Sequence, residues 1–298
     1  MRDLVAVHGG IDMPSDAATF RVLEAAAMAG WLERSDAVAG VVAAVEELES
    51  SPLFNAGYGS VLTRGGNVEV DAAIVDGSRA RIAAVAAVPE LRHPIRVAAA
   101  LLEAGLAALL VGDGARAFAT SVGEPTEDLR TDAQILALRD ALAGVDINAF
   151  TGIAQTPRTE TVGAIAHFAG SVVAGTSTGG LIGKPSGRVG DSAIFGAGHW
   201  ADERVAVLCS GEGEALIRAR SASECAARIL AGAPVRDAVA WAVLQLELQT
   251  GARGAILATD CLTGEIAAAH NGMDFPVVCF DGDAMSIVIP SPLVGVSS

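Results

Sequence analysis

The chain has 298 residues, of which 51% are hydrophobic and 4% aromatic, and its formal net charge is −15. This length allows one large domain or two smaller ones, with a core built from aliphatic side chains. This negative charge would repel nucleic acid and anionic membranes, which argues against either as a partner.

The first half of the chain shows the periodicities of both strands and helices. Its predicted elements are a strand over 4–7, helices over 16–33 and 38–49, strands over 68–75 and 82–88, and a helix over 94–108. Ser15 or Asp16 can cap the first helix, because each offers a side-chain oxygen to free backbone N–H groups. His8-Gly9-Gly10 follows the first strand and predicts a tight turn.

The most apolar stretch, 97–111, is too short to span a bilayer, and Glu103 interrupts it. A buried helix that runs into a strand is the better interpretation. Beyond it, residues 123–158 are polar and mixed, with one predicted helix over 132–142. The segment 148–160 has the composition of an exposed linker.

The character of the chain changes at Thr161. From there the predicted elements are strands over 161–166, 171–176 and 205–209, helices over 215–231 and 235–248, and strands over 255–259 and 265–269. Strands thus come in neighbouring pairs, with pairs of helices between them. This order favours antiparallel sheets covered by helical layers over a parallel, doubly wound sheet.

Several common functional motifs are absent from the sequence. Gly211-Glu212-Gly213 lacks the third glycine of a dinucleotide loop, and no Ser or Thr follows Lys184, as a phosphate loop requires. There is no G-x-S-x-G elbow and no H-E-x-x-H helix. Metal-dependent hydrolysis and a Ser-His-Asp triad therefore have little support. The histidines are interpreted as packing or surface residues: His8, His93, His167, His199 and His270.

The four cysteines form no C-x-x-C pair and fit no zinc spacing. They are Cys209, Cys225, Cys261 and Cys279. No basic stretch followed by a long apolar one opens the chain, so no secretory signal is expected. Scattered thiols without a signal predict a protein of the reducing cytoplasm.

The second half contains four segments rich in glycine and small hydroxyl residues. They are 161–166 (TVGAIA), 176–180 (TSTGG), 187–192 (GRVGDS) and 209–214 (CSGEGE). In this order they resemble the β-subunit of the plant-type asparaginase and isoaspartyl aminopeptidase family of N-terminal nucleophile hydrolases. In the first half, the segments similar to the family's α-subunit are 8–10, 51–60, 69–72 and 76–77.

The resemblance covers most of the chain, from residue 4 to about 275. It implies an α+β fold, a four-layer αββα sandwich of two antiparallel sheets between helix layers, in a single domain over 1–298. It also implies self-cleavage into an α-subunit, 1–160, and a β-subunit, 161–298. A homodimer of such αβ units is the expected assembly.

The chemistry of an N-terminal threonine can be argued from the residues themselves. A threonine hydroxyl is a weak nucleophile and needs a base beside it. Cleavage between Glu160 and Thr161 would free the α-amine of Thr161, whose pKa of roughly 7.7–8 suits a base near neutral pH. The change from linker to strand supports cleavage at the same bond. Thr161 is therefore the predicted nucleophile, and this chemistry requires no cofactor.

The resemblance assigns roles to further residues. The Ser210 hydroxyl and the Gly211 N–H form an oxyanion hole and contact the substrate, and Thr178 supports the nucleophile. Arg188 and Asp191 match the residues that hold the α-carboxylate and α-amine of an amino-acid substrate. Arginine can bind a carboxylate through two parallel hydrogen bonds. This pair favours a free or N-terminal aspartyl substrate over the substrates of an endoprotease.

Each assignment has a simpler structural alternative. The alternatives are a strand residue for Thr161, a turn residue for Thr178, a helix cap for Ser210, and a surface ion pair for Arg188 and Asp191. Asn55 and Asp71 are interpreted as structural residues that brace the site.

The opening departs from the family pattern, since it reads His8-Gly9-Gly10-Ile11-Asp12 rather than HGGAG. Three residues nearer the predicted chemistry depart from it as well. Glu160 precedes the nucleophile where Gly or Asp is usual, and its charge and bulk predict slower cleavage. Ser210 replaces a threonine but keeps the hydroxyl group, whereas Glu212 places a negative charge near the oxyanion hole.

The family often binds a structural sodium ion through backbone carbonyls, which here correspond to Leu48, Glu49, Ser51, Phe54, Ala56 and Tyr58.

Together these residues predict an enzyme that hydrolyses L-asparagine, β-aspartyl dipeptides or both, and releases L-aspartate. Its partner is a small amino-acid amide or dipeptide, with no nucleic acid and no membrane. One alternative is a glycosylasparaginase-like amidase, which a cytoplasmic location disfavours. The other is a non-catalytic family member that binds an amino acid and never matures, which Glu160 and Glu212 support.

Overall fold

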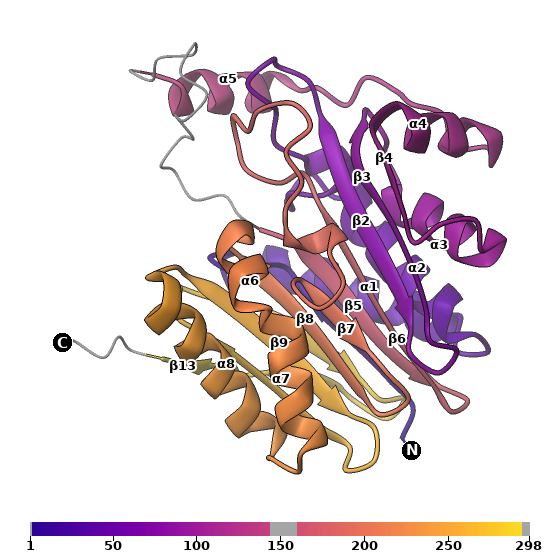
Figure 1. Ribbon diagram of the computed structural model, residues 1–298, viewed down its shortest axis with the longest axis vertical. Helices are drawn as coiled ribbons and strands as arrows, with labels where there is room; N and C mark the ends of the chain where they lie inside the picture. The colour runs from indigo at the N-terminus through magenta and orange to yellow at the C-terminus, as the bar shows by residue number, and fades with distance from the viewer. Residues whose placement is uncertain (1, 144–159, 294–298) are drawn as a thin grey trace.

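The computed structural model describes residues 2–143 and 160–293. Two β-sheets face each other in this part of the chain, and helices cover the outer face of each sheet (Figure 1). This is the four-layer α+β sandwich that the resemblance implied.

The first sheet has the strand order β12-β11-β1-β5-β6-β2-β3-β4. The strands are β1 (Leu4–His8), β2 (Glu69–Asp76), β3 (Arg81–Pro89), β4 (Leu109–Val111), β5 (Val162–Phe168), β6 (Ser171–Thr178), β11 (Val277–Phe280) and β12 (Met285–Val288). Neighbours are antiparallel except β3 and β4, which are parallel. A helix connects these two strands, and such a crossover returns the chain in the same direction.

The second sheet has the order β13-β10-β9-β8-β7. The strands are β7 (His199–Ala201), β8 (Val205–Gly211), β9 (Gly254–Asp260), β10 (Glu265–His270) and β13 (Ser291–Pro292). Only β10 and β13 are parallel. The two sheets are therefore antiparallel, as predicted, apart from one parallel pair at an edge of each.

The helices form an outer layer on each sheet. The first sheet carries α1 (Ala17–Leu32), α2 (Ala37–Ser50), α3 (Pro94–Ala104) and α4 (Gly112–Ser121), and the second carries α6 (Gly213–Ala219), α7 (Ser221–Leu230) and α8 (Val235–Thr250). Helix α5 (Asp132–Ala141) lies at one end of the molecule, apart from both layers (Figure 1).

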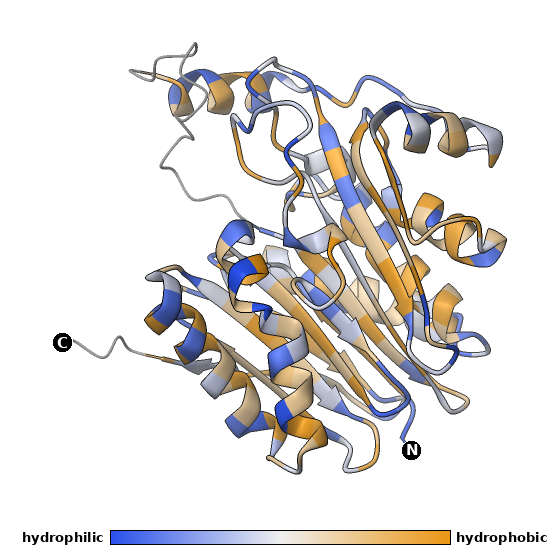
Figure 2. Ribbon diagram, in the orientation of Figure 1, coloured by the Kyte–Doolittle hydropathy of each residue, from blue (hydrophilic) through white to orange (hydrophobic). Residues whose placement is uncertain are grey.

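The central strands are mostly apolar along their length, as the pale to orange colours of most of their segments show (Figure 2). In β1, Val5 and Val7 face the first helix layer, whereas Leu4 and Ala6 face the second sheet. Successive side chains of a strand point to opposite faces, so a strand between two packed layers needs an unbroken apolar run. This explains why the strands were visible as continuous runs in the sequence.

Local backbone conformations correct two predicted helices. The helix predicted over 94–108 ends at Ala104, because Gly105 adopts a left-handed conformation (φ 63°) and caps it. The chain then enters β4, as the interpretation of the apolar stretch 97–111 required. The helix predicted over 215–231 is broken at Arg220 (φ 52°) into α6 and α7. The predictions also omitted α4 and the short strands β7, β11, β12 and β13.

The two halves of the chain share the first sheet. Strand β1 lies between β5 and β11, both of which come from residues beyond 160. Strand β2 pairs with β6 in the same way. Hydrogen bonds thus connect the segments on either side of the predicted cleavage site along the full length of these strands.

Candidate active site

The β5–β6 hairpin brings Thr161 and Thr178 together. Thr161 directly precedes β5, and the antiparallel register pairs Val162 with Ser177, the neighbour of Thr178. The Thr178 hydroxyl donates a hydrogen bond of 3.2 Å to the carbonyl oxygen of Glu160. The predicted scissile carbonyl is therefore already polarised by a hydroxyl donor in the intact chain.

Ser210 approaches Thr161 from the second sheet. Its Oγ accepts hydrogen bonds from the N–H of Thr161 (3.2 Å) and from the N–H of Ile11 (3.0 Å). These bonds use the lone pairs of the hydroxyl, so its own proton can point to another acceptor. The structure thus places Ser210 beside the predicted nucleophile rather than at a helix cap, and its oxyanion-hole role stays a prediction.

Glycines allow the backbone to close around the predicted cleavage site. Gly10 has φ 101°, and a Cβ there would lie 2.9 Å from the Cβ of Glu160. Gly211 has φ 153°, and a Cβ there would lie 2.6 Å from the carbonyl oxygen of Arg253. Both positions require glycine, because other residues rarely adopt these conformations and a side chain would collide.

Glu160 is buried, with 6% of its surface exposed. The predicted exposure of 148–160 is therefore wrong for its last residue, while 144–159 lie outside the described residues. The turn around Gly10 and the Thr178 hydroxyl both contact Glu160, and they cover it. The backbone of Glu160 is thus held against the end of β5.

Asn55 contacts the turn that follows Thr178. Its Nδ2 donates to the carbonyl oxygen of Gly180 (2.7 Å), and its Oδ1 accepts from the N–H of Val61 (2.9 Å). Its backbone oxygen also accepts from the N–H of Gly179 (2.8 Å). These contacts are those of a residue that braces the turn, as the sequence suggested.

Asp71 lies at an irregularity in the pairing of β2 with β3. Its carboxylate accepts from the N–H of Ala87 (2.7 Å) and from the N–H of Gly190 (3.3 Å). Such bulges often redirect a side chain beside an active site. Here the bulge connects β2 to the loop that carries Arg188 and Asp191.

Arg188 and Asp191 do not form the surface ion pair considered above. The Arg188 guanidinium instead binds Glu214 through two parallel hydrogen bonds, Nε to Oε1 (2.9 Å) and Nη2 to Oε2 (2.7 Å). Only 10% of the Arg188 side chain is exposed. Nη1, the nitrogen without a bond to Glu214, lies beside Gly190, where a Cβ would be 2.8 Å away.

Asp191 is almost completely buried, and burial raises the pKa of its carboxyl group from 3.8 to about 7, although Arg188 opposes the shift. Its Oδ2 has no hydrogen-bond partner among the described residues. Oδ2 lies beside Gly198, whereas Oδ1 lies beside Gly213, where a Cβ would be 3.0 Å away.

We expect Asp191→Asn to raise the unfolding temperature at pH 8. The folded-state pKa of Asp191 lies above its unfolded value, so the carboxyl contributes stability below about pH 4 and loses it as the pH rises to about 7. At pH 8 the ionised carboxylate costs up to about 4 kcal/mol. Thermal unfolding at pH 5 and pH 8 checks this, with Asp113→Asn, an 89% exposed acid, as the control. Equal gains at both pH values would contradict it.

A cleft joins the predicted catalytic and substrate-binding residues. Its lining consists of Thr161, Thr178, Gly180, Leu181, Arg188, Gly190, Asp191, Ser192, Gly211 and Gly213. Two functional candidates escaped the sequence analysis. Ser192 has its Oγ 3.1 Å from Oγ1 of Thr161, and Glu214 binds Arg188. Each lies inside a motif segment quoted above, but nothing in the sequence indicates its partner.

Glu212 is not among the residues that line the cleft. Its side chain is exposed, and its Oε1 accepts a hydrogen bond of 3.0 Å from the N–H of Arg253.

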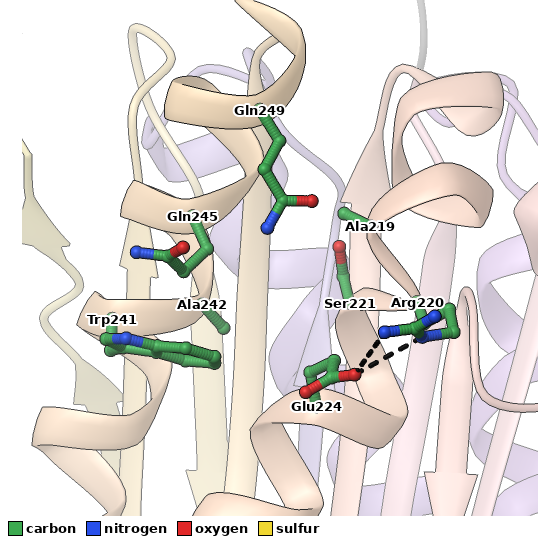
Figure 3. A pocket seen from close by; sticks show the side chains of 8 residues that line it. All are labelled: Ala219, Arg220, Ser221, Glu224, Trp241, Ala242, Gln245 and Gln249. Carbon is green, nitrogen blue, oxygen red and sulfur yellow. Dashed lines mark hydrogen bonds and ion pairs between the residues drawn. The ribbon is translucent and has the colours of Figure 1, made fainter.

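A second groove, between α7 and α8, contains none of the predicted site residues (Figure 3). Its polar lining residues include Arg220, Ser221 and Glu224.

The predicted sodium loop begins in the last turn of α2, which contains Leu48 and Glu49, and continues beyond the helix. Carbonyl oxygens of Glu49, Ser51 and Phe54 lie within 3.0 Å of the positions that Cβ atoms would occupy at Gly57 and Gly59. These carbonyl oxygens pack against the two glycines, where a side chain would collide with them. Sodium binding stays a prediction, which unfolding temperatures in sodium and tetramethylammonium chloride can check. The carbonyls of Leu48, Ala56 and Tyr58 accept hydrogen bonds from other groups of the protein.

Other reactive side chains are inert or remote. Burial lowers the pKa of His8 to about 3 and those of His167 and His199 to about 4, so these rings are neutral. All four cysteines are buried free thiols. Across residues 2–143 and 160–293, no three His, Cys, Asp or Glu side chains are placed to hold a metal ion. No helix in this part of the chain could cross a membrane.

Comparison with known proteins identifies the family of the chain. A family model described as asparaginase matches residues 4–289. The isoaspartyl peptidase of Salmonella typhimurium is 39% identical over 250 residues, 80% of each chain. The plant-type L-asparaginase of Pyrococcus abyssi is 39% identical over 229 residues, 72% of this chain and 75% of that protein. The isoaspartyl peptidase/L-asparaginase of Danio rerio is 39% identical over 73% of each chain. With a match across nearly its whole length, this chain belongs to the asparaginase family.

Proposed function

We propose that this chain is a threonine-type amidohydrolase that releases L-aspartate from L-asparagine and from β-aspartyl dipeptides. The observation that carries the proposal is the cleft that places Thr161 beside Arg188 and Asp191. A cationic and an acidic group side by side match the carboxylate and amine of an amino acid. The names of the relatives, isoaspartyl peptidase and L-asparaginase, describe the same substrate class.

Maturation begins in the intact chain at the Glu160–Thr161 bond. Oγ1 of Thr161 attacks the carbonyl carbon of Glu160, the C–N bond breaks, and the proton of Oγ1 passes to the departing nitrogen. The chain is then joined through an ester, with a free α-amine on Thr161. Water then hydrolyses the ester. The Thr178 hydroxyl supports this step, because it donates to the carbonyl oxygen on which negative charge develops.

The mature enzyme uses Thr161 as both nucleophile and base. Its α-amine takes the proton of Oγ1 as Oγ1 attacks the side-chain amide carbon of the substrate, and then gives that proton to the leaving amine. A water molecule hydrolyses the resulting acyl-enzyme and releases aspartate. Ser210 and Gly211 are the proposed donors to the oxyanion, which their positions beside Thr161 and in the cleft support.

The head group of the substrate is held at the other end of the cleft. Glu214 occupies the Nε–Nη2 edge of Arg188, which leaves Nη1 for the α-carboxylate. Asp191 receives the α-amine, and the arriving ammonium group favours its ionised form. Both contacts are almost completely buried, so they discriminate against substrates that lack either charge.

The two subunits, 1–160 and 161–298, are proposed to remain one folded domain after cleavage. The position of β1 between β5 and β11 and the pairing of β2 with β6 support this, because separation would break three strand ladders. A homodimer of αβ units and a cytoplasmic location are carried over from the sequence analysis as proposals. Light scattering measures the first, and cell fractionation the second.

Mass spectrometry and amidase assays test the proposal together. We expect purified protein to convert within days into two fragments whose junction is Glu160–Thr161, and to release aspartate from L-asparagine and β-aspartyl-leucine. A chain that stays whole in several buffers would support the non-maturing alternative. Faster hydrolysis of a glycosylated asparagine would instead support the glycosylasparaginase-like alternative.

A further inference from the structure

Ser192 touches the reacting atom of the predicted nucleophile. Its Oγ lies 3.1 Å from Oγ1 of Thr161, and only 1% of the residue is exposed. We propose that Ser192 is a catalytic residue that orients the Thr161 hydroxyl for attack, in self-cleavage and again in substrate turnover. This inference rests on the proposed function of Thr161.

Hydrogen bonds fix the backbone of Ser192. The Thr176 hydroxyl donates to its carbonyl oxygen (2.9 Å), and the neutral ring of His199 is also hydrogen-bonded to its backbone. Thr176 lies on β6 and is completely buried. A hydroxyl anchored in this way can fix the position of another group, because its own position is set by the sheet.

One short helical turn carries both the substrate contact and the nucleophile contact. The 3₁₀ turn Asp191–Ala193 presents the Asp191 carboxyl to the substrate amine and the Ser192 hydroxyl to Thr161. Because the two residues are adjacent, any movement of the turn displaces both contacts together. Ser192 therefore couples the position of the nucleophile to that of the bound head group.

The contact serves to orient rather than to remove a proton. A serine hydroxyl is too weak a base to take the Thr161 proton near neutral pH. In turnover that proton goes to the freed α-amine of Thr161, and in self-cleavage it ends on the Thr161 nitrogen as that nitrogen leaves the Glu160 carbonyl. Either hydroxyl can donate in the pair, and no bond is made or broken between them. The hydrogen bond with Ser192 favours one direction for Oγ1. It adds to the rotamer preference of Thr161, whose side chain is β-branched.

Ser192→Ala should slow self-cleavage and lower kcat about tenfold to a hundredfold, with KM changed less than about twofold. The rate of cleavage is followed by intact mass, and kcat is expressed per cleaved chain. Ser221→Ala is the matched control. Ser221 is 2% exposed, its hydroxyl has no hydrogen-bond partner within the described chain, and it lines the groove of Figure 3 rather than the cleft.

A second variant separates orientation from loss of stability. Thr161→Ser keeps the hydroxyl but loses the methyl group that restricts its rotation. If Ser192 orients Oγ1, Ser192→Ala should cost several-fold more in kcat in the Thr161→Ser background than in the wild type. A purely structural role of Ser192 would lower the unfolding temperature and leave the two kcat effects equal.

The outcomes distinguish the inference from the proposed function. A wild-type chain that neither splits nor hydrolyses its substrates overturns the proposed function and the role of Ser192 with it. An active wild type with a Ser192→Ala variant of unchanged cleavage rate and kcat overturns only the inference. A rise in KM at constant kcat also overturns it, because Ser192 would then contact the substrate rather than the nucleophile.

Discussion

Thr161→Ala should remain one chain of 298 residues and hydrolyse neither L-asparagine nor β-aspartyl dipeptides. The substitution removes Oγ1, which attacks the Glu160 carbonyl in maturation and the substrate amide in turnover. We expect kcat to fall at least about 10⁴-fold, the scale seen when a nucleophile is removed from an enzyme that forms a covalent intermediate. Intact-mass spectra and aspartate release measure the two effects separately.

Two controls show whether this loss is chemical. Thr259→Ala removes another buried threonine hydroxyl, one bonded to His167, and should split and turn over normally. Thr161→Ser keeps a nucleophilic hydroxyl and should still split. If the Thr161→Ala variant were still cleaved directly after Glu160, another group would drive maturation, and the assignment of Thr161 would be wrong.

Arg188→Ala should leave self-cleavage largely intact, because the chain itself holds the scissile bond in place. Hydrolysis of L-asparagine should fall in kcat/KM by roughly 30- to several-thousand-fold, which corresponds to about 2–5 kcal/mol for a buried charge-assisted contact. Part of this loss arises indirectly. Arg188 lowers the pKa of Asp191, so its removal leaves more of that carboxyl protonated and unable to bind the substrate amine.

Methyl esters of the substrates separate the direct contribution. Esterifying the α-carboxylate should reduce kcat/KM in the wild type by a similar factor, and should add little in Arg188→Ala, since both changes break one contact. Arg116→Ala, a half-exposed arginine paired with Asp113, is the matched control and should change neither value. Additive losses would show that Arg188 does not bind the carboxylate.

Local sequence patterns determined the order of the main elements. The predicted hairpin after Thr161 is β5 and β6, and the predicted pair near the C-terminus is β9 and β10. These elements were visible because apolar periodicity and turn residues are properties of neighbouring residues. The errors have a local cause too. Arg220 breaks a helix because it adopts a left-handed conformation. The presence of an arginine in the sequence does not predict this conformation.

The sequence motifs also contain most of the residues that line the cleft. Thr161, Thr178, Arg188, Asp191 and Gly211 all line it. Each belongs to a short run of glycine and hydroxyl residues whose order along the chain could be compared with a known family. Membership of that family is now shown, whereas the roles of the individual residues stay predictions.

Tertiary structure alone decided which of these groups meet. Arg188 and Glu214 are 26 residues apart, and Thr161 and Ser192 are 31 apart. Neither pair is visible in the sequence, because sheet pairing and the packing of the two sheets bring them together. Burial likewise moves the pKa of Asp191 to about 7. The cost of holding a charge away from water depends on every layer around it, and no local pattern of residues records that environment.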